Sequence, residues 1–480
     1  MLLELAHSLR NVDPDRPAVL GSISRTALAD LADGYALALH HSGLSTGDTL
    51  GVAVRPGPRA LAVMLAAHRL GLRVAVFDPG AGPDVLRARL ALAAPVLVVA
   101  DAAAQAVAGW ARPLARRAGI ALPSLRAIAP VVTVGRRLPG CAPVLPPRDG
   151  TPPAPFDGDG DALVIFTSGT TSAPRAVVHT RASVSAGTAA VASLVRPARG
   201  APVIGGTLFV LVPALASGAP VALPARSPRR LARQLAAVRP QATYLTPPQL
   251  RAALAAGARF TGSVYSGSAP VSAPLLGRVV AAGAAQAYGV YALTEFFPAA
   301  VVSSVDKGSY VGDGDLVGAP LPDVSATVDA GGQLRLAGPQ SADRYLGSPP
   351  LAHVDTGDAA FVDNGRIVLA GRVKDMILRG AENVYPGLYE PALHVPGVDL
   401  AVLVGIPAGD GDERLVAVVQ PRPGLPARAV RAALTEPLRR MGSARPDAIV
   451  LAEVPLSGRS RKPDRAAAAA LAARCIGGAS

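Results

Sequence analysis

Residues 162–175 read ALVIFTSGTTSAPR, and the fold is deduced outward from this stretch. Its first five residues are apolar and predict a short strand, which runs directly into a turn of hydroxyl side chains and glycine. Backbone N–H groups in such a turn can surround phosphate oxygens, with the hydroxyls as extra donors and Arg175 as a counter-charge. The turn is not a Walker loop, because no Gly-Lys-Ser/Thr follows the required glycine spacing. On this stretch alone, a Ser/Thr-rich surface turn is an equal alternative.

Upstream of the turn, helical spacing alternates with short β-rich runs. Helices are expected at 27–40 and 60–70, and strands at 49–54, 73–77 and 96–100. This order implies parallel strands joined by helical crossovers. Residues 138–160 are rich in proline and glycine without any period, which predicts a loop or linker. Asp157, Asp159 and Asp161 are spaced like the start of a calcium loop, but no closing Glu follows, so a solvated turn is expected.

The composition is that of a globular protein with more than one packed unit. The chain has 480 residues, of which 50% are hydrophobic and 17% charged, and this excludes a chain that is disordered overall. Its 50 Gly and 46 Pro follow no three-residue period, so collagen is excluded. The two cysteines, Cys141 and Cys475, predict neither a disulfide framework nor a metal cluster. A reducing, cytoplasmic location is the expectation.

The formal charge of +13 is compatible with nucleic acid, an anionic membrane or anionic small molecules. Only three of the 47 basic residues are lysines, and the arginines are read as a compositional bias. Nucleic-acid binding is not expected, because it needs clustered cations and usually stacking aromatics. The N-terminus shows no basic region before an apolar run, so no signal peptide is expected. Residues 201–225 are uncharged, but prolines and glycines interrupt them, so we expect buried strands at 207–212 and 220–223 instead of a membrane span.

Further segments follow the turn in a recognisable order. They are SGSAP at 266–270, YALTE at 291–295, TGD at 356–358, GRVKDMILRGAENVYP at 371–386 and KPDR at 462–465. With FTSGTTSAPRAVVH at 166–179, they resemble the motifs of the adenylate-forming acyl ligases, the superfamily of acyl-CoA synthetases, luciferases and peptide-synthetase adenylation domains. The resemblance covers about 300 residues and implies an α/β fold. A large N-terminal domain of α/β subdomains plus a distorted β-barrel, 1–371, would precede a small mobile C-terminal α/β domain, 372–480, that closes with a helix at 466–473.

The resemblance also implies an ATP site. The 167–175 loop would hold the β- and γ-phosphates, and the 266–270 turn would also contact the nucleotide. Tyr291 would stack on adenine, Thr294 would meet the α-phosphate, and Glu295 would bind Mg²⁺, since a cation bridging phosphates suits a carboxylate. Asp358 and Arg372 would hold the ribose hydroxyls. The nucleotide-binding residues expected from the loop and the turn are Thr167, Ser168, Gly169, Thr170, Thr171, Arg175, Ser268, Ala269 and Pro270.

Three residues of the C-terminal domain would serve the two half-reactions. Lys462 would bridge the substrate carboxylate and the α-phosphate, because a compact ammonium can follow charge between oxygens. Lys374 would lie at the hinge on which the domain swings. Gly380 would line the pantetheine tunnel of CoA. Catalysis would rest on Lys462, Thr294 and Glu295, with ATP, Mg²⁺ and CoA as cofactors.

Four positions depart from the family pattern: Ser172, Arg175, Ala292 and Arg461. Arg for Lys at 175 keeps the charge but changes its geometry. Ser172 and Ala292 would strain the backbone if those sites need a positive φ. A degenerate relative that binds nucleotide without catalysis is therefore an alternative.

The acceptor has two candidate chemistries. The hinge segment resembles that of fatty-acid CoA ligases, which indicates a CoA thioester as product. RPGP at 55–58, FDPGAG at 77–82 and GWAR at 109–112 instead resemble olefin-pathway β-lactone synthetases, in which the hydroxyl of a β-hydroxy acid attacks its own adenylate. We favour the CoA ligase, because the hinge motif is longer and nearer the chemistry. TYLTPPQLRAAL at 243–254 resembles a wall of the acyl site and favours an apolar carboxylic acid; no oligomeric state follows from the sequence.

Overall fold

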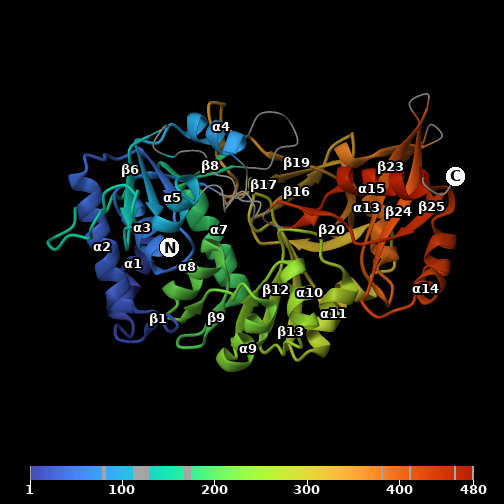
Figure 1. The fold of residues 1–480 in the computed structure, drawn as a ribbon, viewed down its shortest axis with the longest axis horizontal. Coiled ribbons are helices and arrows are strands. Elements are labelled where there is room, and N and C mark those ends of the chain that lie inside the picture. Colours follow the sequence, from blue (N-terminus) through green and yellow to red (C-terminus); the bar gives the residue numbers. More distant parts are fainter. Residues whose placement is uncertain are drawn as a thin grey trace.

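A computed structural model describes residues 2–77, 83–111, 125, 129–166, 175–379, 382–409, 412–458 and 461–477. The architecture is mixed α/β, with two large sheets in the N-terminal part and a small sheet in the C-terminal part (Figure 1). This is the predicted fold class, a large N-terminal domain followed by a small C-terminal one. The boundary between 371 and 372 stays a prediction.

The first large sheet forms from the N-terminal third of the chain and the strands around the expected phosphate loop. Its order is β18-β8-β7-β4-β3-β5-β6. The pairs β3–β4 and β3–β5 are parallel, as the sequence predicts, and β4–β7 and β5–β6 are parallel as well. The strands are β3 (Thr49–Ala53), β4 (Arg73–Val76), β5 (Leu97–Asp101), β6 (Val131–Val134), β7 (Asp161–Phe166), β8 (Ala176–Thr180) and β18 (Arg344–Tyr345).

The second sheet has thirteen described strands in the order β16-β17-β19-β20-β15-β14-β13-β12-β11-β9-β10-β1-β2. The strands from β13 to β1 pair in parallel, and those from β13 to β16 pair antiparallel. The antiparallel end takes the place of the expected barrel, and the described residues form no closed barrel. The strands are β1 (Pro17–Val19), β2 (Ile23–Ser24), β9 (Val203–Ile204), β10 (Val221–Ala222), β11 (Ala242–Tyr244), β12 (Ser263–Ser266), β13 (Gln286–Tyr291), β14 (Ala300–Ser303), β15 (Asp315–Pro320), β16 (Ser325–Val328), β17 (Gln333–Ala337), β19 (Val354–Asp363) and β20 (Arg366–Arg372).

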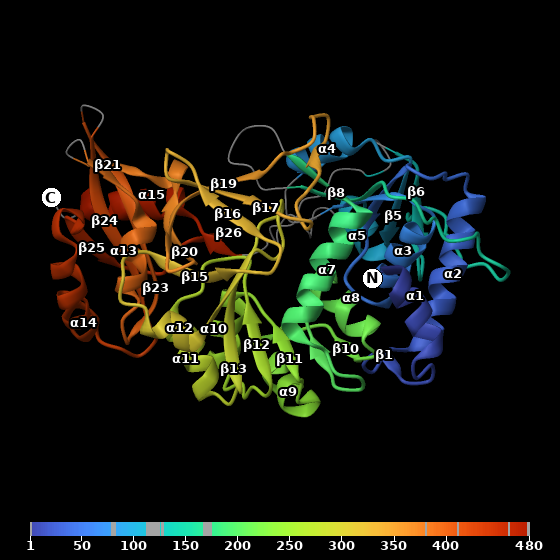
Figure 2. The same ribbon diagram turned by 180° about the vertical axis from the view of Figure 1, so that it is seen from behind.

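Helices cover both sheets and fill the space between them (Figures 1 and 2). The largest apolar core lies between the two sheets and includes side chains from α1, α2, α3, α7 and α8, whereas α9, α10 and α11 pack on the other face of the second sheet. The helices are α1 (Leu2–Asn11), α2 (Arg25–His41), α3 (Pro58–Arg69), α4 (Pro83–Ala93), α5 (Ala102–Ala108), α7 (Arg181–Val195), α8 (Leu208–Ala216), α9 (Pro228–Val238), α10 (Pro247–Ala255), α11 (Ala273–Ala281) and α12 (Ser304–Ser309).

One predicted strand is wrong. Residues 207–212 belong to the start of α8, in which Thr207 caps the helix by accepting a hydrogen bond from the Phe209 N–H at 3.2 Å. A short apolar run is compatible with either a buried strand or a buried helix, and the β-branched valines favoured the strand. Burial of the helix between the sheets decides the conformation. The second expected strand, at 220–223, is present as β10.

The C-terminal part, residues 372–480, is called the lid below. Its sheet has the order β23-β24-β25 and packs against three helices. The alanine-rich end forms the expected closing helix, α15. The elements are η3 (Val373–Asp375), β21 (Ile377–Arg379), β22 (Glu382–Val384), α13 (Pro386–Leu393), β23 (Val398–Gly409), β24 (Asp412–Pro421), α14 (Ala427–Arg440), η4 (Gly442–Ala444), β25 (Ala448–Leu451), β26 (Leu456–Ser457), β27 (Lys462–Pro463) and α15 (Arg465–Gly477).

Close contacts hold the lid against the N-terminal part. Arg278 of α11 lies 2.8 Å from the Asp399 carboxylate at β23. Gly387 of α13 packs so near Gly371 of β20 that a Cβ at 387 would lie 2.6 Å from the Gly371 Cα.

The two parts also differ in the exposure of their cysteine thiols. Cys141 is buried in the N-terminal part, and Cys475 on α15 is exposed.

Candidate active site

The expected nucleotide-binding residues gather where parallel strands end. β11, β12 and β13 run in parallel, so their carboxyl ends lie at one edge of the second sheet. The turn 267–270 follows β12, and the segment 292–295 follows β13. Ser268 adopts φ +68° and its hydroxyl lies 2.9 Å from the Tyr244 hydroxyl at the end of β11. This edge therefore holds the residues expected to meet the nucleotide and the acid.

Asp358 is the centre of a hydrogen-bonded cluster at this edge. It lies opposite Arg372 in the β19–β20 register, and the Arg372 Nε is 2.9 Å from its Oδ1. The Tyr291 hydroxyl donates to its Oδ2 at 2.6 Å. Burial, and then the negative charge of Asp358, raise the pKa of Tyr291 well above its ordinary value, so the phenol stays a donor at neutral pH. Thr356 fixes the turn, because its Oγ1 accepts the Asp358 N–H at 3.0 Å.

Glu295 lies beside a tyrosine that the sequence did not single out. The Tyr345 hydroxyl donates to the Glu295 Oε1 at 3.2 Å. The guanidinium of Arg175 lies over the Tyr345 ring, 5.5 Å from its centre, which is a cation–π contact. Tyr345 thus joins the end of the expected phosphate loop to the expected magnesium ligand. The sequence could not predict this contact, because it depends on the pairing of the two-residue strand β18, which carries Tyr345, with β8.

Thr294 is held by a buried histidine. The His179 Nε2 lies 2.8 Å from the Thr294 carbonyl oxygen, so this nitrogen carries the proton and donates. Burial lowers the pKa of His179, which keeps the imidazole neutral. The ring of Phe297, two residues after Glu295, packs edge-on against this imidazole, with centroids 5.3 Å apart. His179 closes the phosphate-loop segment in sequence, yet its position gave no indication of this contact.

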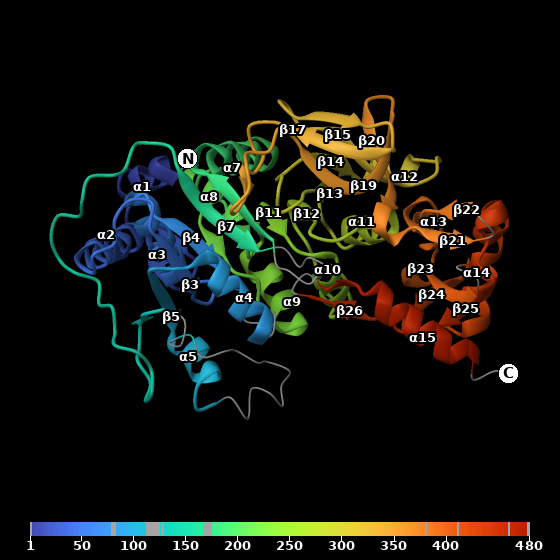
Figure 3. The same ribbon diagram turned by 90° about the horizontal axis from the view of Figure 1, so that it is seen from above.

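Lys462 reaches this cluster from the lid. It lies on β27, which pairs with β26 on the side of the lid that faces the N-terminal part (Figure 3), and it is exposed to solvent although much of the surrounding protein is close by. Surrounding protein lowers the pKa of its ammonium, first by desolvation and next by the charge of Arg372, while the carboxylates of Asp358 and Glu295 oppose the shift. Lys374 adds a smaller lowering effect. Lys462 therefore shares one electrostatic environment with Arg372, Asp358, Glu295 and Lys374.

Some expected residues lie outside the part of the chain that the structure describes. These are Thr167, Ser168, Gly169, Thr170, Thr171, Ser172 and Gly380. Among the other departures, Ala292 does not adopt a positive φ, so the expected strain is absent there, whereas Arg461 does, at +49°. Within the described residues, no cluster of three or more His, Cys, Asp or Glu could hold a metal ion. A magnesium ion would thus depend on Glu295 together with phosphate oxygens.

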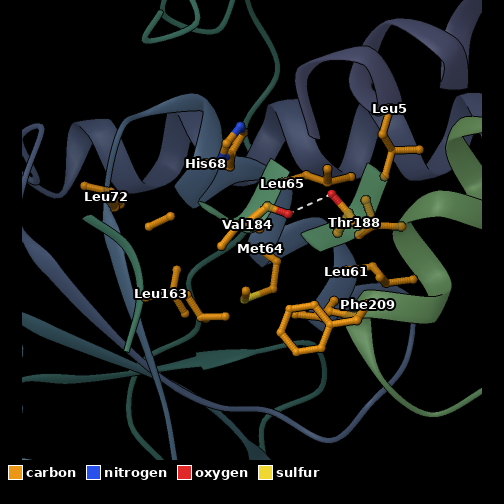
Figure 4. Close-up of a pocket in the computed structure, with 14 residues that line it drawn as sticks. Leu5, Leu61, Met64, Leu65, His68, Leu72, Leu163, Val184, Thr188 and Phe209 are labelled. Atoms are coloured by element: carbon orange, nitrogen blue, oxygen red, sulfur yellow. Dashed lines mark hydrogen bonds between the residues drawn. The ribbon is translucent and has the colours of Figure 1, made fainter. Parts of the chain in front are cut away.

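An apolar cavity lies behind the site, between α1, α3, α7 and α8 and above β4 and β7 (Figure 4). It has a volume of about 40 Å³, and its lining is apolar except for His68 and Thr188. The Thr188 hydroxyl is satisfied by the Val184 carbonyl at 2.8 Å. Phe209 lines the cavity and packs its ring against Phe297, with centroids 3.6 Å apart. Two aromatic rings therefore separate the cavity from the segment that carries Glu295.

Comparison with known proteins places this geometry in a family. A model of the AMP-binding enzyme family matches residues 7–346. This chain belongs to the AMP-binding enzyme family. The match covers both large sheets except for the last strands of the second, and it includes every expected site residue up to Glu295. The resemblance deduced from the motifs is confirmed.

Individual members of the AMP-binding family differ in what they act on. Feruloyl-CoA synthase from an Amycolatopsis species is 30% identical over 330 residues, 61% of this chain and 66% of that protein. The olefin β-lactone synthetase of Stenotrophomonas maltophilia is 28% identical over 86% of this chain and 83% of its own length. The fatty acid–[acyl-carrier-protein] ligase ScoC of Streptomyces coeruleorubidus is 34% identical over 184 residues, so this chain spans about a third of its length in that match.

Solved structures of the same fold cover nearly the whole chain. The amide bond synthetase McbA from Marinactinospora thermotolerans has a TM-score of 0.77 and 22% identity, covering 97% of this chain and 99% of McbA. The anthranilate CoA ligase AuaEII has a TM-score of 0.79 and 18% identity, with 98% of each chain covered. The fold of this AMP-binding enzyme thus extends through the lid. None of its described helices has the length and apolar character needed to cross a bilayer.

Proposed function

We propose that this enzyme activates an apolar carboxylic acid with ATP and then transfers the acyl group to CoA. In the first step, a carboxylate oxygen bonds to the α-phosphorus while the bond to pyrophosphate breaks, which forms an acyl-adenylate. The observation that carries the proposal is that Arg372 pairs with Asp358 at 2.9 Å, and that Lys462 of the lid shares the charge environment of these two groups and of Glu295. Two of these groups are cationic and two anionic, as needed to hold a nucleotide and to balance charge that moves during phosphoryl transfer.

Each residue has a role in this proposal. Asp358, oriented by Tyr291 and Arg372, presents a carboxylate to the ribose hydroxyls. Glu295 would hold Mg²⁺, which supplies positive charge at the phosphates. Lys462 bridges the incoming carboxylate and the α-phosphate. Arg175 adds positive charge over the ring of Tyr345, whose hydroxyl donates to Glu295.

The nature of the acid is supported by the aromatic wall. Phe297, two residues after Glu295, packs its ring against Phe209, so the Glu295 segment adjoins an aromatic surface. No carboxylate among the expected acyl-site residues 243–254 could pair with an amino acid's ammonium. An apolar acid matches such a lining better than an amino acid does.

Lys462→Ala tests the proposal. Acid-dependent exchange of labelled pyrophosphate into ATP is expected to disappear, while the Kd for ATP changes little, because Lys462 acts on charge formed during the reaction. The control is Arg474→Ala, because Arg474 is an exposed cation on α15 and its loss should leave exchange unchanged. Lys307 is unsuitable as a control because its side chain is buried. Normal exchange in the Lys462 variant would remove its proposed role.

A bulky substitution at Gly380 separates the two half-reactions. Gly380→Trp should preserve pyrophosphate exchange and block thioester formation, because the substitution would fill the proposed pantetheine tunnel. Equal loss of both activities would reject the tunnel.

A β-lactone synthetase is the second candidate. It is favoured by the olefin β-lactone synthetase match over 86% of this chain. In that reaction the β-hydroxyl oxygen attacks the activated carbonyl carbon, the lactone C–O bond forms, and AMP leaves. A panel of carboxylic acids, incubated with and without CoA, distinguishes the products by mass: a thioester, a lactone, or none for a degenerate relative that only binds nucleotide.

A further inference from the structure

Basic charge is concentrated in one part of the chain. From residue 162 to residue 294 there is no Asp or Glu, and there are twelve arginines. This stretch accounts for nearly all of the net charge of +13. The interpretation of arginine as a general compositional bias missed this distribution.

Two kinds of arginine stand out among the twelve of this stretch. Some have defined partners, such as Arg278 with Asp399 and Arg199 with Asp13. Others are exposed along α9 and at its two ends, and none of these forms an ion pair within the described residues. We call this second group the arginine face; it consists of Arg226, Arg229, Arg230, Arg233 and Arg239.

Several of these positions are unfavourable for folding alone. Arg229 and Arg230 lie in the first turn of α9, where the helix dipole favours negative charge, and that turn contains no acidic residue. Arg239 follows the helix with φ +47°, a conformation that suits glycine better. Like charges one turn apart, at 229 and 233, also repel each other. A counter-charge from outside the chain would relieve the two electrostatic costs, at the first turn and between 229 and 233.

The arginine face begins at the edge of the sheet that holds the active site. β10 runs parallel to β9, which continues in parallel to β11 and β12, so the carboxyl ends of these strands share an edge. Arg226 follows the end of β10 by four residues. β10 lies three strand positions from β12, roughly 14 Å at the usual spacing. The helix α9 itself lies at the outer margin of the N-terminal part (Figures 1 and 2).

We propose that the arginine face docks an acidic carrier protein whose pantetheine arm delivers a thiol to the acyl-adenylate. The inference rests on the proposed function and extends its acceptor from CoA to a protein that carries the same arm. The thiol sulfur bonds to the acyl carbon, the bond from that carbon to the AMP phosphate oxygen breaks, AMP leaves, and the thiol proton passes to solvent. Free CoA uses the same site without the arginine face.

An acidic protein is favoured over the other polyanions. Guanidinium groups pair with carboxylates through two parallel hydrogen bonds, which suits an acidic helix. An anionic membrane surface is normally bound with apolar anchors as well, and none of the exposed large apolar side chains of the described chain lies between 226 and 239. Single-stranded nucleic acid is bound with stacking aromatics, and residues 226–239 contain none.

The test compares two acceptors in one enzyme. Arg229→Glu/Arg230→Glu should lower kcat/KM for a holo acyl carrier protein by at least tenfold and weaken its salt dependence. Pyrophosphate exchange and transfer to CoA should stay within twofold, which also shows that the variant is folded. The matched control is Arg136→Glu/Arg148→Glu, which makes the same charge change at exposed positions of the N-terminal part and should leave all three rates unchanged.

Three results would overturn the docking proposal. The first is an unchanged kcat/KM of the Arg229→Glu/Arg230→Glu variant for the carrier protein. The second is an equal fall in its kcat/KM for CoA, which would assign the arginine face to the phosphates of CoA. The third is normal transfer to the carrier protein while the variant no longer binds phosphatidylglycerol vesicles. Absence of acid-dependent pyrophosphate exchange in the unmodified enzyme is a different outcome, because it would refute the proposed function itself.

Discussion

At the scale of single residues, the site depends on how Asp358 is oriented. One carboxylate oxygen is bonded to Tyr291 and the other to Arg372, so the side chain cannot rotate without losing both contacts. Only about 7% of the side chain is exposed. A buried carboxylate held in this way is ordered before any ligand arrives, which lowers the entropic cost of binding.

Asp358→Asn should therefore weaken ATP use. The amide lacks the charge that strengthens both hydrogen bonds, each worth roughly 1.5–3 kcal/mol, so kcat/KM for ATP is expected to fall 10- to 100-fold. Asp355→Asn on the same strand is the control, because Asp355 is about half exposed and pairs with Arg335 at the surface. That variant should change kcat/KM by less than twofold. Equal effects of the two substitutions would contradict a specific role for Asp358.

Arg461 is a second informative residue, since it precedes Lys462 with φ +49°. The left-handed conformation costs an ordinary residue about 1–2 kcal/mol, which glycine at this position would not lose. Part of that advantage is offset because glycine has greater conformational freedom in the unfolded chain. Arg461→Gly should raise the thermal midpoint by about 1 °C and preserve exchange. Arg445→Gly, at φ −63°, should lower the midpoint instead. A lower midpoint for both variants would show that the turn is unstrained.

At the scale of elements, helix α3 places the imidazole of His68 against the apolar core. Burial and the nearby charge of Arg181 lower the pKa of His68 from 6.5 to about 3. The folded protein thus resists protonation of a group that the unfolded chain protonates below pH 6.5. The stability that the neutral imidazole contributes is present above pH 6.5 and is lost as the pH falls toward 3.

His68→Gln should make the protein less sensitive to acid. The thermal midpoint of the unmodified protein is expected to fall more between pH 7 and pH 4.5 than that of the variant, and His40→Gln, at an exposed position of α2, should behave like the unmodified protein. Identical pH profiles for all three proteins would mean that His68 does not contribute.

Sequence and structure agree best where the signal is local. Spacing predicts β3, β4, β5 and β7 of the first sheet and helices α2 and α3, but not β6, β8 or β18. The family resemblance of the strand-end motifs implied that Tyr291, Asp358 and Arg372 meet one nucleotide, and the structure brings them together. The sequence did not indicate Tyr345 or His179, because their contacts with Glu295 and Thr294 join segments 50 and 115 residues apart. Helix α8 was mistaken for a strand because its burial, set by both sheets, overrides the preference of its valines.

At the scale of the whole molecule, the lid orientation depends on a backbone contact. Gly387 and Gly371 meet where α13 packs on β20, and a Cβ at 387 would also lie 2.7 Å from the Ala370 carbonyl oxygen. Backbone on both sides leaves no flexible side chain to move aside. The described orientation, in which Asp358 and Glu295 act electrostatically on Lys462, is therefore compatible with glycine at 387 and disfavoured by a larger residue.

Gly387→Ala should slow pyrophosphate exchange roughly tenfold, because overpacking of about 1–3 kcal/mol would disfavour this orientation. Gly277→Ala in α11 is the matched control, since no described atom lies within 4 Å of the position that a Cβ would take there. The control should exchange at the normal rate. Unchanged exchange in the Gly387 variant would show that adenylation does not use the described orientation.

The distribution of the two cysteines offers a way to observe the lid directly. Cys475 is exposed at the end of α15, and Cys141 is buried in the N-terminal part. A maleimide dye should therefore attach to the lid alone, without any engineered thiol. Paired with a second fluorophore on the N-terminal part, that dye would report the distance between the two parts during each turnover, molecule by molecule.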